Sequence, residues 1–119
     1  MKRVFLSTLV LALALSAVAW AKVSIKVTPS AVKAGKVVTV SGSTGKGCAK
    51  GDRVTLLSKA FSSKHRFAGV PAVYAKSGTG GAFSVKTTIP KSRKAGKYTV
   101  TGRCGGGNLG VSAMLKVTK

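Results

Sequence analysis

Apolar and polar residues alternate along most of the chain after residue 22, which is the pattern of half-buried β-strands. In the first such run, Val23, Ile25 and Val27 alternate with polar residues. The same alternation predicts six strands, at residues 23–28, 37–41, 54–56, 83–89, 98–104 and 111–117. One or two more are expected within residues 60–76. Glycine-rich turns separate the runs and none has helical periodicity, so we predict an all-β antiparallel sandwich of about seven strands.

The first 21 residues follow a different pattern. Lys2 and Arg3 precede an apolar run at 4–15, and Ala19-Trp20-Ala21 has the small-x-small form that signal peptidase cleaves after. We therefore predict a signal peptide at 1–21 and one secreted or cell-envelope domain at 22–119. A membrane anchor is the alternative, since the apolar run is only slightly shorter than a span of about 20 residues, but the small-residue cleavage site lies where a signal peptide has it.

Three phrases of the predicted domain match a known pattern of strands and turns. They are VTPS at 27–30, AGKVVTVSGS at 34–43 and AGKYTVTGRC at 95–104. In these phrases the chain resembles secreted bacterial immunoglobulin-like domains. The resemblance implies an immunoglobulin-like β-sandwich that serves as an adhesion, spacer or carrier module. The chain departs from antibody-type domains because its only tryptophan, Trp20, lies in the predicted leader. A chromophore-carrier role, as in enediyne-binding apoproteins, is more distant, because those proteins usually have a second disulfide.

The two cysteines, Cys48 and Cys104, predict a structural disulfide, because an even pair in an exported chain is usually oxidised. Cys48 follows the second predicted strand and Cys104 ends a later one, so the bridge is expected to tie a loop to a strand end. In the chain-entropy model a bridge that closes so long a loop stabilises by on the order of 4 kcal/mol. A metal site is not expected, since it needs more ligands and His65 is the only histidine.

The net charge of the chain is the strongest indication of what it binds. The chain has 21 lysines and arginines against one acidic side chain, Asp52, and its formal net charge is +20. Such a surface cannot neutralise itself with internal ion pairs, so it attracts counterions or polyanionic partners. Some of the lysines also lie on the polar faces of predicted strands, where they discourage edge-to-edge aggregation.

The inventory of catalytic groups is short. Asp52 and His65 are the only conventional acid–base candidates, so chemistry that needs two carboxylates is excluded. Serines are abundant, so the residue types of a Ser-His-Asp site are present. Asp52 and His65 nevertheless lie beside basic residues, and the simpler interpretation is that Asp52 is a turn residue and His65 is solvated. We therefore expect that the chain is not an enzyme and that it needs no cofactor or metal.

Two basic clusters are candidate polyanion-binding sites. The first lies between Phe61 and Phe67, and the second lies before and at the start of the strand at 98–104. Their residues are Lys64, His65 and Arg66 in the first, and Lys91, Arg93, Lys94 and Lys97 in the second. Basic groups near aromatic rings can combine phosphate contacts with base stacking. The alternative is that both clusters are solvated loops and the phenylalanines belong to the core.

These features predict a secreted, highly basic, non-enzymatic binding or structural module that associates electrostatically with anionic extracellular polymers. Cell-wall polysaccharide, teichoic acid and non-specifically bound nucleic acid are the expected partners, with peripheral association at anionic membrane surfaces. The alternative function is a cationic antimicrobial or toxin-like effector that acts on anionic membranes. Against that alternative, no segment after the leader forms a basic amphipathic helix.

Overall fold

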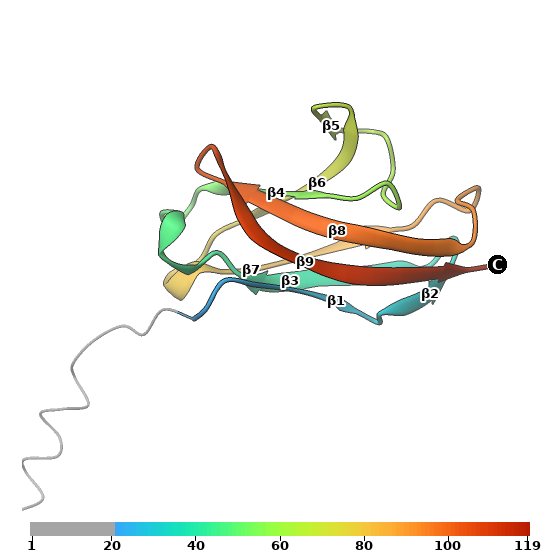
Figure 1. Ribbon diagram of the computed structural model, residues 1–119, viewed down its shortest axis with the longest axis horizontal. Coiled ribbons are helices and arrows are strands. Elements are labelled where there is room, and N and C mark those ends of the chain that lie inside the picture. The colour runs from blue at the N-terminus through green and yellow to red at the C-terminus, as the bar shows by residue number, and fades with distance from the viewer. Residues whose placement is uncertain (1–20) are drawn as a thin grey trace, which may run out of the picture.

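The computed structural model describes residues 21–119, and their alternating side chains form strands (Figure 1). Along this part of the chain the strands are β1 (Ser24–Thr28), β2 (Ala31–Lys33), β3 (Val37–Ser43), β4 (Arg53–Leu57), β5 (Arg66–Phe67), β6 (Val70–Lys76), β7 (Ala82–Thr88), β8 (Gly96–Cys104) and β9 (Gly107–Thr118). Two short 3-10 turns, η2 (Gly45–Gly47) and η3 (Thr79–Gly81), follow β3 and precede β7. The predicted signal peptide lies outside the described residues, apart from Ala21.

The strands form two sheets that face each other (Figure 1). One sheet has three antiparallel strands in the order β1-β3-β7, and the other has six in the order β2-β9-β8-β4-β6-β5. The chain passes between the sheets repeatedly, as from β3 to β4 and from β6 to β7. The predicted all-β sandwich is therefore confirmed. Between residues 21 and 119 no helix is long and apolar enough to cross a membrane.

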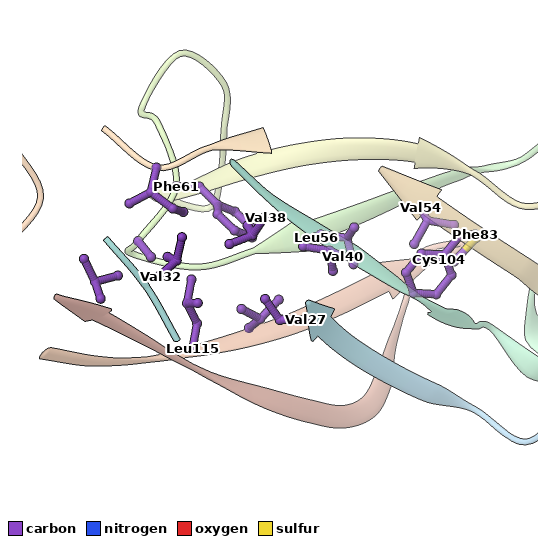
Figure 2. Close-up of a cluster of buried hydrophobic side chains, with 14 of the residues drawn as sticks. Val27, Val32, Val38, Val40, Val54, Leu56, Phe61, Phe83, Cys104 and Leu115 are labelled. Carbon is purple, nitrogen blue, oxygen red and sulfur yellow. The ribbon is translucent and has the colours of Figure 1, made fainter. Parts of the chain in front are cut away.

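Side chains that point between the sheets form one hydrophobic core (Figure 2). Val38 and Val40 of β3, Leu56 of β4 and Leu115 of β9 are each no more than 1% exposed. Phe61, in the segment after β4, is fully buried and belongs to the same core. Phe61 is one of the two phenylalanines that flank the first basic cluster. It belongs to the core, as the alternative interpretation of that cluster expected.

The observed strands differ from the predicted ones in two places. The pairing of β2 with β9 is parallel, and β2 was not predicted because three residues are too few to show an alternation. The glycines after Cys104, which form one of the predicted glycine-rich turns, make a tight hairpin in which β9 begins at Gly107. Gly105 and Gly106 have φ of 63° and 81°, as a type I′ turn requires at both central positions.

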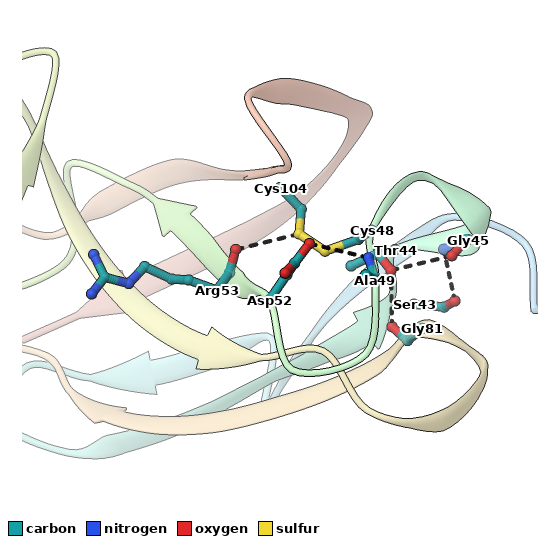
Figure 3. The surroundings of a disulfide bond; sticks show 9 residues. All are labelled: Ser43, Thr44, Gly45, Cys48, Ala49, Asp52, Arg53, Gly81 and Cys104. Carbon is teal, nitrogen blue, oxygen red and sulfur yellow. Dashed lines mark hydrogen bonds between the residues drawn. A yellow bond between two sulfur atoms is a disulfide. The ribbon is translucent and has the colours of Figure 1, made fainter.

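The predicted disulfide between Cys48 and Cys104 is present (Figure 3). Cys48 lies in the loop after η2, Cys104 is the last residue of β8, and their Cα atoms are 5.8 Å apart. The bridge thus ties a loop to a strand end, as predicted. Because that loop follows β3 of the smaller sheet, the disulfide also holds the two sheets together at one end of the sandwich.

Candidate polyanion interface

The outer face of the six-stranded sheet carries a group of polar and aromatic side chains whose position follows from strand alternation. In β4 the buried Val54 and Leu56 point into the core, so Arg53 and Thr55 point outward. In β8 the buried Val100 and Cys104 likewise direct Arg103 outward. Strand register brings these positions together, because Thr55 lies opposite Tyr74 of β6 on one side and opposite Arg103 on the other.

Aromatic rings hold both arginines of this face. The Arg53 guanidinium carbon lies 4.3 Å from the centroid of the Tyr74 ring, and that of Arg103 lies 5.0 Å from the centroid of the Phe67 ring. The His65 ring packs beside Tyr74, with ring centroids 5.3 Å apart and planes at 44°. We call Arg53, His65, Phe67, Tyr74 and Arg103 the basic–aromatic face. Cation–π contacts of this kind fix a guanidinium in place without neutralising its charge.

The edge of the sheet must curl for this face to form. Neighbouring strands are about 4.8 Å apart, so in a flat sheet β5 would lie about 14 Å from β8. The Phe67–Arg103 contact therefore requires the β5–β6 hairpin to bend over the outer face, and β5 stands above the sheet in Figure 1. Its turn, Ala68-Gly69, has φ of 53° and 83°, the strongly twisted type I′ conformation. Arg66 donates from Nη1 to the Gly69 carbonyl oxygen at 3.1 Å, across the same turn.

The basic–aromatic face has no acid of its own. Asp52 is the only acidic side chain of the sequence, and its Oδ2 accepts a hydrogen bond from the Ala49 amide at 3.2 Å within the turn before β4 (Figure 3). Beside the face is an open hollow of about 530 Å³ lined by Gly51, Arg53, Tyr74, Ala75 and Lys76. The positive charge of this region therefore remains available to an anion from solution.

The second predicted cluster is divided by the structure. Lys91 and Lys94 join Lys33 and Lys119 around a hollow of about 350 Å³, to which Arg93 also contributes. Lys97 lies elsewhere, in a hollow of about 450 Å³ with Leu57, Lys59, Val70 and Thr101 among its lining residues. The hollow around Lys91 and Lys94 lies before the start of β8, whereas Arg103 lies near the end of that strand. At about 3.4 Å per residue, the two basic regions are more than about 20 Å apart.

Arg93 has a structural role as well as a charge. Its Nε donates to the Ala60 carbonyl oxygen at 3.3 Å and its Nη2 to the Phe61 carbonyl oxygen at 2.7 Å. The segment that contains the buried Phe61 is thereby fastened to the loop before β8. Of the cluster residues, Arg93 is thus the least free to move toward a ligand.

We expect Arg93→Ala to lower the free energy of unfolding by about 2 kcal/mol, because two carbonyl groups lose a charged donor. Lys94→Ala is the matched control, since it removes one charge from the same loop and should change stability by less than about 0.5 kcal/mol. Urea unfolding followed by circular dichroism gives both values. Equal effects of the two substitutions would show that the Arg93 hydrogen bonds do not stabilise the fold.

Sequence reasoning found only part of the basic–aromatic face. Of the first cluster, His65 belongs to it because its ring packs on Tyr74, whereas Arg66 bonds within its own turn. Lys64, like His65, is exposed. Arg53, Tyr74 and Arg103 were not predicted as site residues. Their alternation with buried residues placed them on an outer face, but strand pairing between distant segments brings them together.

The two acid–base candidates, Asp52 and His65, have different surroundings. His65 packs on Tyr74, whereas Asp52 lies close to the two cysteines, with ligand atoms of the three residues within 4.8 Å of one another. The cysteine sulfurs are bonded to each other, so in this state they offer no thiolates to a metal ion.

Comparison with known proteins places the fold but not the family. No known protein family matches the sequence. No curated protein matches it either. The fold is similar to that of a solved structure of Pseudomonas fluorescens alkylpurine DNA glycosylase AlkC bound to DNA containing an abasic site analog, with a TM-score of 0.54 and 19% sequence identity. The similarity covers 81% of this chain and 29% of that chain, so this chain spans less than a third of that enzyme.

A second similar structure is that of an uncharacterized protein from Bacillus anthracis, with a TM-score of 0.45 and 17% identity over 85% of this chain and 84% of that chain.

The prediction that this chain is not an enzyme is contradicted by the first likeness, because the matched structure is an enzyme that contains this fold. A short inventory of catalytic groups in one domain does not decide the matter. At 19% identity the likeness shows the fold alone and assigns no reaction.

Proposed function

We propose that this protein is an exported, immunoglobulin-like module that binds anionic polymers through its basic surface, with the basic–aromatic face as the principal contact. The observation that carries the proposal is the fixing of Arg53 and Arg103 on aromatic rings, on a face without carboxylates. Cationic side chains that are held in place repel one another, and a bound polyanion relieves that repulsion. Binding also releases the counterions of the polyanion, which favours association. The guanidinium groups also suit phosphate and carboxylate geometry.

Two further features support export and the immunoglobulin-like character. The Cys48–Cys104 disulfide is typical of proteins from oxidising compartments. A three-stranded sheet packs on a larger one, as expected of an immunoglobulin-like sandwich. Two of the sequence segments that resemble immunoglobulin-like domains lie on β3 and β8. Nucleic acid is included among the partners to be tested, since the DNA glycosylase of similar fold is bound to DNA.

We expect the protein to bind immobilised heparin and single-stranded DNA, with affinity that falls steeply as salt rises, by at least about tenfold between 50 and 200 mM NaCl. The double substitution Arg53→Gln with Arg103→Gln should weaken binding by about tenfold or more at 150 mM salt. Its matched control is Lys26→Gln with Lys86→Gln, which removes the same charge from exposed positions on the three-stranded sheet. The control should weaken binding no more than about threefold, since exposed charges beyond a Debye length of about 8 Å are screened.

The two variants separate a localised site from a diffuse one. Equal losses in both would show that total charge governs binding, and the assignment to the basic–aromatic face would then be wrong. Failure of the unaltered protein to bind any of these polyanions, or binding that is insensitive to salt, would overturn the proposed function itself.

A further inference from the structure

Charge alone does not account for the aromatic residues of the basic–aromatic face. In the described part of the chain, Phe61 and Phe83 are 0% and 5% exposed, whereas Phe67 is 41% exposed at the curled edge of the sheet. Exposing an apolar ring of this size is unfavourable in water. Holding the Arg103 guanidinium accounts for the ring's contact within the protein, but it does not account for the apolar surface that the ring still exposes.

We propose that the basic–aromatic face binds single-stranded nucleic acid, with an unpaired base stacked on Phe67 and neighbouring phosphates held by Arg53 and Arg103. This inference rests on the proposed polyanion-binding function and names the class of ligand for the same site. It depends on the exposed ring, on the placement of the two arginines, and on the different role of Tyr74.

The two arginines lie on adjacent strands in diagonal positions. Arg103 is opposite Thr55, and Arg53 lies two residues before Thr55 on the same strand and face. Diagonal positions of this kind are separated by about 7–8 Å. Two long side chains at that spacing can contact successive phosphates of one strand, and each is already oriented by an aromatic ring.

The two aromatic rings of the face are not equivalent. Tyr74 is half-buried, with the Arg53 guanidinium over its ring and His65 packed beside it, so it positions the other two groups. Phe67 has Arg103 on its ring and remains substantially exposed. Phe67 is therefore the ring on which a base can stack, with the guanidinium extending the stack.

A stacking site of this kind distinguishes single-stranded from duplex nucleic acid. In a duplex the faces of the bases are covered by their neighbours, and only phosphates and groove edges are accessible. An unpaired strand presents both its phosphates and its base faces. Polyphosphate and teichoic acid share the phosphate charge but have no bases, so they would contact the arginines alone.

The test is fluorescence anisotropy at 150 mM NaCl with a labelled twelve-nucleotide oligothymidylate, an abasic oligomer of the same length and charge, and a duplex of the same length. We expect the unaltered protein to bind oligothymidylate about tenfold more tightly than either of the other two, because stacking adds to the phosphate contacts. Phe67→Ala should abolish that preference, because it removes the stacking ring and so weakens oligothymidylate binding about tenfold more than it weakens abasic binding. Phe67→Trp should retain the preference.

Met114→Ala is the matched control, because Met114 is the other large apolar side chain exposed on this sheet, at 54%, in a strand that does not contribute to the face. It should leave all three affinities unchanged. Competition by hyaluronate, a carboxylated polysaccharide, tests whether the ring stacks on sugars instead.

The possible outcomes distinguish this inference from the function on which it rests. Salt-sensitive binding with equal affinity for oligothymidylate and the abasic oligomer would overturn the stacking inference and leave polyanion binding intact. A loss of hyaluronate affinity on Phe67→Ala as large as that for oligothymidylate would overturn it in favour of a glycan. Absence of binding to every anionic probe would overturn the proposed function.

Discussion

Reduction of the Cys48–Cys104 disulfide is expected to lower the thermal midpoint of unfolding by about 15–30 °C. Cross-linking residues that are 56 positions apart restricts the unfolded chain and contributes on the order of 4 kcal/mol. In a domain of this size each kcal/mol shifts the midpoint by about 4–8 °C. Because the total stability of such domains is only about 5–15 kcal/mol, this single bond accounts for a large share of it.

The effect of reduction should be larger at low salt. With the bridge intact the unfolded chain stays relatively compact, so its many positive charges continue to repel one another. Without the bridge the unfolded chain expands and relieves that repulsion, which favours unfolding. The extra loss should diminish when salt screens the charges, at 0.5 M compared with 0.02 M NaCl.

Far-UV circular dichroism, with and without reductant at both salt concentrations, measures these midpoints. Cys104→Ser should reproduce the reduced protein, and reductant should have no further effect on this variant. Thiol counting on the denatured, unreduced protein is the direct control. Two free thiols per chain would show that the bridge does not form and would overturn this account of its contribution to stability.

The local pattern of the sequence was sufficient for most strands of the fold. Alternation fixes which side chains of β3 and β7 face the core, since it depends only on neighbouring residues. The disulfide was predictable from the number of cysteines and the signal-peptide pattern. By contrast, β2 is held by parallel pairing with β9, and its three residues contain no pattern of their own.

The candidate site was less predictable because four of its residues come from four different strands and the fifth, His65, from the segment before β5. Local clustering of basic residues drew attention to Lys64, His65 and Arg66, which are adjacent in sequence. The contacts that form the face are instead Arg53 with Tyr74 and Arg103 with Phe67, across the sheet. They depend on the register of β4 with β6 and β8 and on the curl of β5, neither of which sequence spacing reveals.

Gly42→Ala is expected to destabilise the fold strongly, because Gly42 is the one glycine of the three-stranded sheet and its position is packed tightly against β1. Gly42 lies in β3, opposite Ile25 of β1 and Phe83 of β7. A Cβ atom at this position would overlap the carbonyl oxygen of Ser24 and lie only 2.8 Å from its carbonyl carbon. Both are backbone atoms of β1, so the conflict cannot be relieved by a change of side-chain rotamer.

The substitution should therefore push β1 away from β3. Val27 of β1 is 6% exposed and belongs to the core, and Ile25 packs against it, so a displaced β1 would expose apolar surface. We expect a loss of about 3 kcal/mol or more, which corresponds to a fall of about 12–24 °C in the thermal midpoint. Amide hydrogen exchange should show the loss first in the β1–β3 hydrogen bonds.

Gly47→Ala is the matched control, because a Cβ at Gly47 would have no heavy atom within 4 Å and the residue lies at the end of η2. It should leave the midpoint within about 3 °C of the unaltered protein, since surface substitutions usually change stability by less than about 0.5 kcal/mol. A Gly42→Ala variant whose midpoint and β1 exchange match those of Gly47→Ala would show that β1 does not pair closely with β3. If Gly42→Ala does not accumulate as folded protein while Gly47→Ala does, that difference also supports the close packing of the two strands.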